Sequence, residues 1–161
     1  MEELIFYRER LMQRLETIAT DFQQAVESIP ASRLYVPLQA GGMSAHQVAA
    51  HLRNVEAQVF LPRLQRILAE ESPQLEKLLG GDWLLKEYRM DEPLEKILTD
   101  FGEMRCQEVR WLKQMPAQSW SRTARHPIWG VRTLQWWVEK SLAHIEDHLR
   151  GLTSDPIGET R

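Results

Sequence analysis

The chain has 161 residues, with 23 acidic and 20 basic side chains and a formal net charge of −3. This length suits a single domain with a real core, and the hydrophobic fraction of 43% is ordinary for a globular protein. The near-neutral charge argues against binding to nucleic acid or a membrane surface, and no apolar run approaches the roughly 20 residues that cross a bilayer. The single cysteine excludes a disulfide framework. We therefore expect a cytoplasmic protein that binds neither nucleic acid nor membrane.

Helical periodicity dominates the first part of the chain. Apolar residues spaced three and four apart predict a helix over about residues 4–29, which Pro30 ends. Ser44, with Gln47 three residues later, forms a capping-box sequence and predicts the start of a second helix. Pro62 should kink this helix or end it near residue 60.

Two long connections separate the later helices. Residues 71–92 and 116–132 contain proline and glycine, and we expect at most one short helix in the first of them. Asp91 and Thr133 predict the starts of the third and fourth helices, and Gly151 predicts the end of the fourth.

These elements predict an all-α fold, a four-helix bundle with two long connections. We assign residues 1–152 to the bundle and residues 153–161 to a flexible C-terminal tail. No segment has the alternating pattern that indicates a β-strand.

Two of the five histidines, His144 and His148, lie four residues apart on the fourth predicted helix. Residues at this spacing share one helix face, so both imidazoles can bind one metal ion. A helical wheel places the pair at the flank of the buried face, within reach of a groove between helices. Such a pair also arises by chance and is weak evidence by itself.

His51 occupies a similar flank position on the second predicted helix. If the second and fourth helices are neighbours, His51, His144 and His148 converge at one end of the bundle. Three neutral nitrogen ligands and an open position are typical of a catalytic metal site. The alternative is that each imidazole only hydrogen-bonds a neighbour. His46 should face solvent and His126 lies in a loop before a proline, so neither is expected to bind metal.

Other metal templates do not fit the sequence. The zinc-protease motif requires Glu directly after the first histidine, where this chain has Ile145. No Glu-x-x-His sequence occurs, which excludes a di-iron carboxylate bundle. We expect Cys106 to be a packing residue and Trp129 to be a candidate wall for a substrate pocket. Trp136 points away from the histidines and is a candidate for a subunit contact.

Three short motifs occur in the order and spacing of a known family. The segment SAHQVAAHL, residues 44–52, resembles the second-helix signature of the DinB/YfiT-like metalloenzymes, in which a capping residue precedes a ligand histidine. Residues 120–134 resemble that family's loop into its last helix. Residues 144–149, HIEDHL, resemble its closing His-x-x-x-His motif. The resemblance spans about residues 4–152.

The resemblance implies a divalent metal ion, often nickel or zinc, held by His51, His144 and His148, and frequent homodimerisation. The better understood relatives are S-transferases of low-molecular-weight bacterial thiols and mycothiol-dependent isomerases. We therefore expect a metal-dependent enzyme that transfers or activates a small thiol, with metal-assisted hydrolysis as the neighbouring reaction. No residue identifies the particular substrate or the general base.

Two alternatives stay open at this point. The first is a non-catalytic metal-binding or stress-response bundle that binds a small ligand as a dimer. The second is a helical bundle in which the histidines are incidental.

Overall fold

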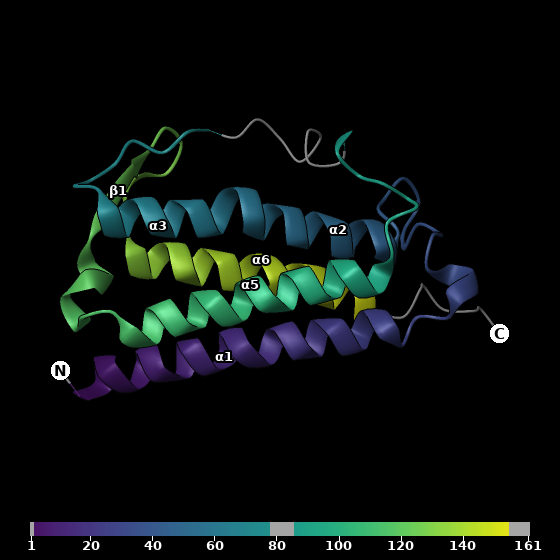
Figure 1. The fold of residues 1–161 in the computed structure, drawn as a ribbon, viewed down its shortest axis with the longest axis horizontal. Helices are drawn as coiled ribbons and strands as arrows, with labels where there is room; N and C mark the ends of the chain where they lie inside the picture. The colour runs from purple at the N-terminus through teal and green to yellow at the C-terminus, as the bar shows by residue number, and fades with distance from the viewer. Residues whose placement is uncertain (1, 78–85, 155–161) are drawn as a thin grey trace.

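A computed structural model describes residues 2–77 and 86–154, and these form the four-helix bundle that the sequence predicts (Figure 1). The second of the four rods is continuous and consists of three helical segments, α2, η2 and α3. Its middle segment is π-helical. The helical elements are α1 (Glu2–Glu27), η1 (Ala31–Arg33), α2 (Ala45–Val55), η2 (Glu56–Phe60), α3 (Leu61–Ala69), α5 (Leu94–Gln114), η3 (Ala117–Ser121) and α6 (Leu134–Thr153).

The order of the rods decides which side chains can meet. In Figure 1, α1 and α6 run in one direction, while the α2–α3 rod and α5 run in the opposite direction. α1 packs against α5 and α6, and α2 packs against α5. The α2–α3 rod also contacts α6 along its length, so the second and fourth rods are neighbours.

The core is built from the apolar stripes that the sequence shows. On α1, Leu15, Ile18 and Phe22 are fully buried at spacings of three and four. They meet side chains such as Leu64 and Ile145 from the other rods. Burial of each of these large side chains contributes about 1.5–3 kcal/mol to stability.

Side-chain caps fix the starts of two helices. Ser44 Oγ accepts a hydrogen bond from Gln47 N at 3.2 Å, and Ser44 N donates to Gln47 Oε1 at 2.9 Å, which confirms the capping box. Thr133 Oγ1 accepts from Trp136 N at 3.2 Å, as predicted. The expected start of the third helix at Asp91 is wrong: α5 begins after Pro93, whose fixed φ suits the entry to a helix.

The second rod continues through Pro62. The sequence allowed either a kink or an end near Phe60, and the rod does not end there. Proline has no N–H group to donate to the preceding turn. The turn before Pro62 is the π-helical segment η2, after which the rod continues as α3. Such π-helical turns are often found at functional sites.

A β-hairpin lies in the connection between α5 and α6, so the prediction that no strand occurs is wrong. Strand β1 (Thr123–His126) pairs antiparallel with β2 (Gly130–Thr133). Each strand has four residues, which is too short for a clear alternating pattern. Gly130 has a φ of 66°, a left-handed conformation that glycine adopts without steric cost.

The predicted end of the last helix also needs correction. α6 continues through Gly151 to Thr153, so Thr153 is helical and does not belong to a tail. The remainder of the predicted tail, residues 155–161, and part of the predicted connection, residues 78–85, lie outside the described residues. No helix in the described ranges has the length and apolar character needed to cross a membrane.

Candidate metal centre

The contact between the second and fourth rods brings three histidines together. His51 lies on α2, and His144 and His148 lie one turn apart on α6. The Nε2 atoms of His51 and His144 are 3.3 Å apart, and one nitrogen from each of the three rings lies within 4.8 Å of the others. The histidines selected from the sequence therefore form one cluster.

Burial makes these imidazoles neutral at ordinary pH. Loss of solvent, with a smaller contribution from His148, lowers the pKa of His51 to about 4. Burial also lowers the pKa of His144 to about 3, with smaller contributions from the other two rings. The pKa of His148 is lowered by its burial as well. Metal binding needs unprotonated imidazoles, which this environment provides.

The cluster geometry fits a small divalent ion. Two nitrogen ligands of a tetrahedral zinc ion at about 2.0–2.1 Å are separated by about 3.3 Å. The distance between the Nε2 atoms of His51 and His144 is 3.3 Å. Imidazole ligands suit nickel as well as zinc. The Nδ1 atom of His51 is buried and has no hydrogen-bond partner among the described residues, so no orienting acceptor is visible for that ring.

The surroundings of the cluster are apolar on one side and hollow on another. The Phe60 ring, from the π-helical turn, lies 5.9 Å from the His144 ring between centroids. A cavity of about 320 Å³ borders His148 and is lined by residues 38–43, Val48 and Asp147. A small molecule could therefore approach the centre beside His148.

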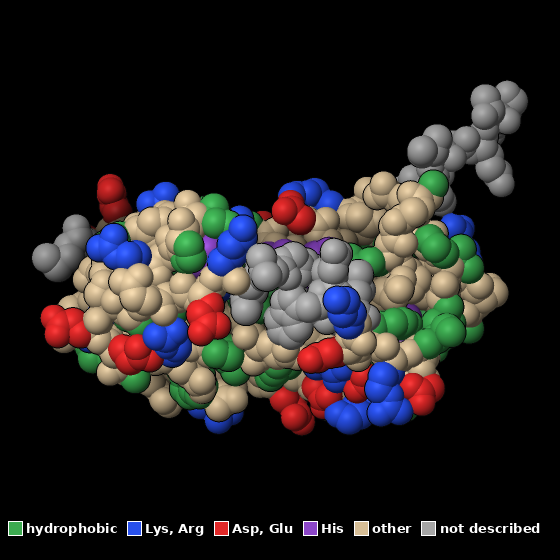
Figure 2. Space-filling view, turned by 90° about the horizontal axis from the view of Figure 1, so that it is seen from above, with side chains coloured by type: hydrophobic (Ala, Val, Ile, Leu, Met, Phe, Trp, Pro, Cys, Tyr) green, Lys and Arg blue, Asp and Glu red, His purple; other side chains and the backbone are tan. Residues whose placement is uncertain are grey.

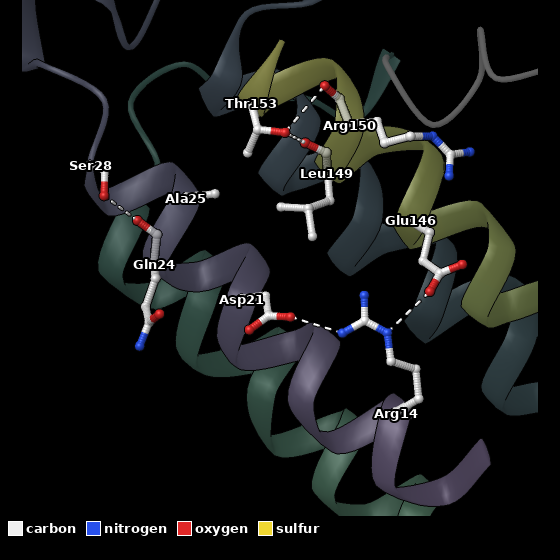
Figure 3. A pocket seen from close by; sticks show the side chains of 9 residues that line it. All are labelled: Arg14, Asp21, Gln24, Ala25, Ser28, Glu146, Leu149, Arg150 and Thr153. Carbon is white, nitrogen blue, oxygen red and sulfur yellow. Dashed lines mark hydrogen bonds and ion pairs between the residues drawn. The ribbon is translucent and has the colours of Figure 1, made fainter. Parts of the chain in front are cut away.

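A larger hollow of about 530 Å³ lies away from the histidines, between α1 and α6 (Figure 3). Its charged side chains pair with one another: Arg14 donates to Asp21 at 2.9 Å and to Glu146 at 3.1 Å. Glu146 thus faces Arg14 of α1 (Figure 3). None of the residues that line this hollow is a histidine or cysteine, so we do not treat it as part of the centre.

The expectation that His46 faces solvent is wrong. His46 is fully buried, with Nε2 2.9 Å from the Glu92 carbonyl oxygen and Nδ1 2.8 Å from the Tyr88 hydroxyl. The Tyr35 ring also lies 4.8 Å from it between centroids. The segment before α5 covers the start of α2, a contact that the helical wheel does not include. His46 therefore helps to join these segments and lies outside the histidine cluster.

The sequence analysis missed a second buried polar cluster. Arg105 donates to Glu108 at 2.7 Å, to Glu56 at 3.1 Å and to Ser141 at 3.3 Å, and all four residues are buried. A signal for it was present, because positions 105 and 108 continue the stripe of Phe101 with the usual spacings of four and three. A stripe defined by apolar residues alone omits these two charged positions.

The remaining expectations about single residues have mixed outcomes. Cys106 is exposed on α5, so its interpretation as a packing residue is wrong. Trp137 is buried in the core. Trp136 is half-buried and packs edge-on against Trp137, with ring centroids 4.9 Å apart. Trp129 stacks on His126, with ring centroids 4.4 Å apart.

A bundle of four helices with three histidines facing one another from two rods defines a class of helical proteins with a potential metal centre. The sequence profile of the DinB superfamily matches residues 14–152. The chain therefore belongs to the DinB superfamily, which confirms the resemblance.

A solved structure gives the same result for the fold. The chain matches YfiT from Bacillus subtilis with a TM-score of 0.81 and 23% sequence identity, over 91% of this chain and 83% of that chain. YfiT is described as a probable metal-dependent hydrolase with an unusual four-helix bundle topology. None of the curated proteins matches the chain.

Proposed function

We propose that the protein is a metal-dependent enzyme in which His51, His144 and His148 hold one divalent ion, nickel or zinc. The main support is that one nitrogen from each ring lies within 4.8 Å of the others, although the rings come from two rods. When bound, an ion with three imidazole ligands and an open position supplies a Lewis acid that lowers the pKa of water or a thiol.

The chain's own residues position and protect this centre. α6 presents His144 and His148 on one face, and α2 presents His51 from the neighbouring rod. Burial keeps the imidazoles unprotonated. The Phe60 ring excludes water on the His144 side, and the cavity beside His148 leaves room for a substrate.

The proposed reaction is transfer or activation of a small thiol, with metal-assisted hydrolysis of a small molecule as the neighbouring possibility. The family resemblance supports the thiol reaction, and the description of YfiT supports hydrolysis. Both reactions need a nucleophile whose pKa is lowered at the same open position.

We further propose that the protein is a cytoplasmic homodimer in which each chain forms a single bundle domain. Exposed apolar side chains on the first turns of α1 support a subunit contact there, since Ile5 and Phe6 are 50% and 58% exposed. Sedimentation of the purified protein at several concentrations would test the dimer.

Metal analysis of the purified protein tests the centre. We expect about one divalent ion per chain in the wild type and almost none in His51→Ala, His144→Ala or His148→Ala. His46→Gln is the matched control, because it removes a buried imidazole outside the cluster, and it should retain the ion. Wild-type amounts of metal in all three alanine variants would show that the assignment is wrong.

Turnover tests the enzymatic part of the proposal. The metal-loaded protein is assayed with small thiols and a chromogenic aryl chloride, and separately with a nitrophenyl ester for hydrolysis. We expect activity that chelation removes and metal restores. Bound metal without turnover in either assay would favour the non-catalytic metal-binding bundle.

A further inference from the structure

Arg63 is a buried cation with few partners. It lies on α3, is 8% exposed, and its guanidinium carbon is 4.9 Å from the centroid of the Trp137 ring. One nitrogen donates to the Glu76 carbonyl oxygen at 3.0 Å. Among the described residues, no carboxylate lies within ion-pair distance of it. A buried guanidinium with so few acceptors is costly unless an anion completes its hydrogen bonds.

Comparison with a paired arginine supports this reading. A hydrogen bond with Glu92 raises the pKa of Arg53, which also faces Asp100. In contrast, burial lowers the pKa of Arg63. Within residues 2–77 and 86–154, the environment of Arg63 therefore lacks the negative charge that accompanies Arg53.

Two uncharged N–H donors lie around the same indole. Nδ1 of His126 accepts from the backbone N–H groups of Ile128 at 3.2 Å and Trp129 at 3.4 Å, so the ring proton is on Nε2. No described group accepts a hydrogen bond from that Nε2. Trp137 Nε1 is also buried without a partner, and its ring lies 5.6 Å from the His126 ring between centroids. Arg63 and His126 thus both lie against the Trp137 ring, whose own Nε1 has no acceptor among the described residues.

The Trp137 ring lies on the same helix as two of the clustered histidines. Trp137 and His144 are seven residues apart on α6, which corresponds to about 10 Å along the axis. Lys140 lies between them, about 6 Å from His144 along the axis, and its ammonium is 5.1 Å from the Trp129 ring centroid. Figure 2 looks down on this side of the bundle and shows histidine, Lys and Arg side chains near one another at its surface.

We propose that Arg63, His126 and Trp137 bind a carboxylate group of the substrate, with Lys140 between this subsite and the clustered histidines. A carboxylate balances the single charge of Arg63 and accepts from the unpaired N–H groups. This subsite rests on the proposed function for where the reaction occurs, but carboxylate binding itself needs no metal.

The test is calorimetric titration of the metal-free full-length protein with mercaptopropionate and with its neutral amide, mercaptopropionamide. We expect the amide to bind at least tenfold more weakly than the acid, and binding of the acid to change the tryptophan fluorescence. Inorganic phosphate should bind more weakly than mercaptopropionate. Tighter binding of phosphate would overturn the assignment to a carboxylate.

Variants identify the residues that bind. Arg63→Gln should weaken binding of mercaptopropionate at least tenfold, and Lys140→Gln a few-fold. Arg132→Gln is the matched control, because Arg132 also lies over a tryptophan ring, at 5.4 Å, but is exposed. If thermal melting shows that Arg63→Gln does not fold, His126→Phe keeps a stacking ring, removes the Nε2 donor and should still weaken binding.

The outcomes separate this proposal from the proposed function. Equal affinity for acid and amide, or equal losses in Arg63→Gln and Arg132→Gln, would overturn the subsite even if the metal centre is real. Carboxylate binding by a protein that never retains metal would support the subsite and contradict the metal-dependent enzyme.

Discussion

The bundle contains two polar clusters that differ in how their groups are satisfied. In the cluster of Arg105, the guanidinium lies 3.1 Å from Glu56 and 2.7 Å from Glu108, so the chain supplies both the cation and the carboxyl groups that accept from it. In the histidine cluster, the Nε2 atoms of His51 and His144 are 3.3 Å apart. Among the described residues, this is the one hydrogen-bond contact between the three rings.

This difference separates a cluster that joins helices from one that is available to a ligand. Arg105 and Glu108 of α5 meet Glu56 of η2 and Ser141 of α6, and therefore connect three rods by charge-assisted hydrogen bonds. The histidine cluster supplies several lone pairs and no internal cation. An external ion is the partner that such a set of nitrogens lacks.

The largest expected effect comes from breaking the paired cluster. Arg105→Leu leaves two carboxyl groups buried without their cation and should lower the free energy of unfolding by about 3–5 kcal/mol. Denaturant unfolding followed by circular dichroism measures this change. Arg110→Leu, at an exposed position of the same helix, is the control and should change stability by less than about 0.5 kcal/mol. Equal free energies of unfolding for Arg105→Leu and Arg110→Leu would show that Arg105 does not stabilise the fold.

Added metal should stabilise the folded protein only by binding to the histidine cluster. With free metal about 100-fold above the dissociation constant, the wild type should gain about 2.7 kcal/mol in free energy of unfolding. His51→Ala should gain almost nothing, whereas Arg110→Leu should gain as much as the wild type. A rise in melting temperature of His51→Ala equal to that of the wild type would place the metal elsewhere.

Acid should destabilise the metal-free protein through the same histidines. Above pH 6.5 the rings are neutral in both the folded and the unfolded chain, so they add no pH dependence. Below it the unfolded chain takes up protons, while the folded pKa values of His51 and His144 are about 4 and about 3. Stability is therefore lost as the pH falls from 6.5 towards 4, by about 1 kcal/mol per histidine at pH 5.5.

Unfolding of the wild type and of a His51→Gln, His144→Gln double variant at pH 7 and pH 5.5 measures this contribution. The double variant should lose less stability between the two pH values, since the other titrating groups are common to both proteins. The same loss in both proteins would mean that the folded rings are protonated as easily as the unfolded ones.

The smallest expected effect is that of Glu108→Gln. Burial raises the pKa of Glu108 well above its usual value, so its carboxyl group tends to carry a proton. Glutamine has the same shape and no charge, and the change in unfolding free energy should stay below about 1 kcal/mol. A loss as large as that of Arg105→Leu would show that Glu108 is ionised in the folded protein.

Sequence periodicity was sufficient for the rods and for the flank positions of the three histidines, but not for their convergence. The four stripes, the caps at Ser44 and Thr133, and the flank positions of His51, His144 and His148 are local properties of helices. The family resemblance added the expectation that the second and fourth rods are neighbours.

Local helix patterns do not predict contacts between segments that are far apart in the sequence. His46 is buried because Tyr88 and Glu92 cover it, and a helical wheel describes only one helix. Arg105 and Glu108 lie in apolar stripes because Glu56 meets them from another rod. In the same way, the four-residue strand β1 is held by pairing with β2 and not by its own pattern.

The π-helical turn Glu56–Phe60 has a consequence for how the second rod can vary. This turn sets the rotational offset between His51 before it and Arg63 after it. Converting this turn to ordinary α-helix at unchanged length would rotate Arg63 by about 90° relative to His51, whereas deleting one residue at the same time would keep the two nearly in phase. The second rod can therefore lose one residue here and keep both halves facing the same neighbours, provided that the π-helical geometry is lost with it.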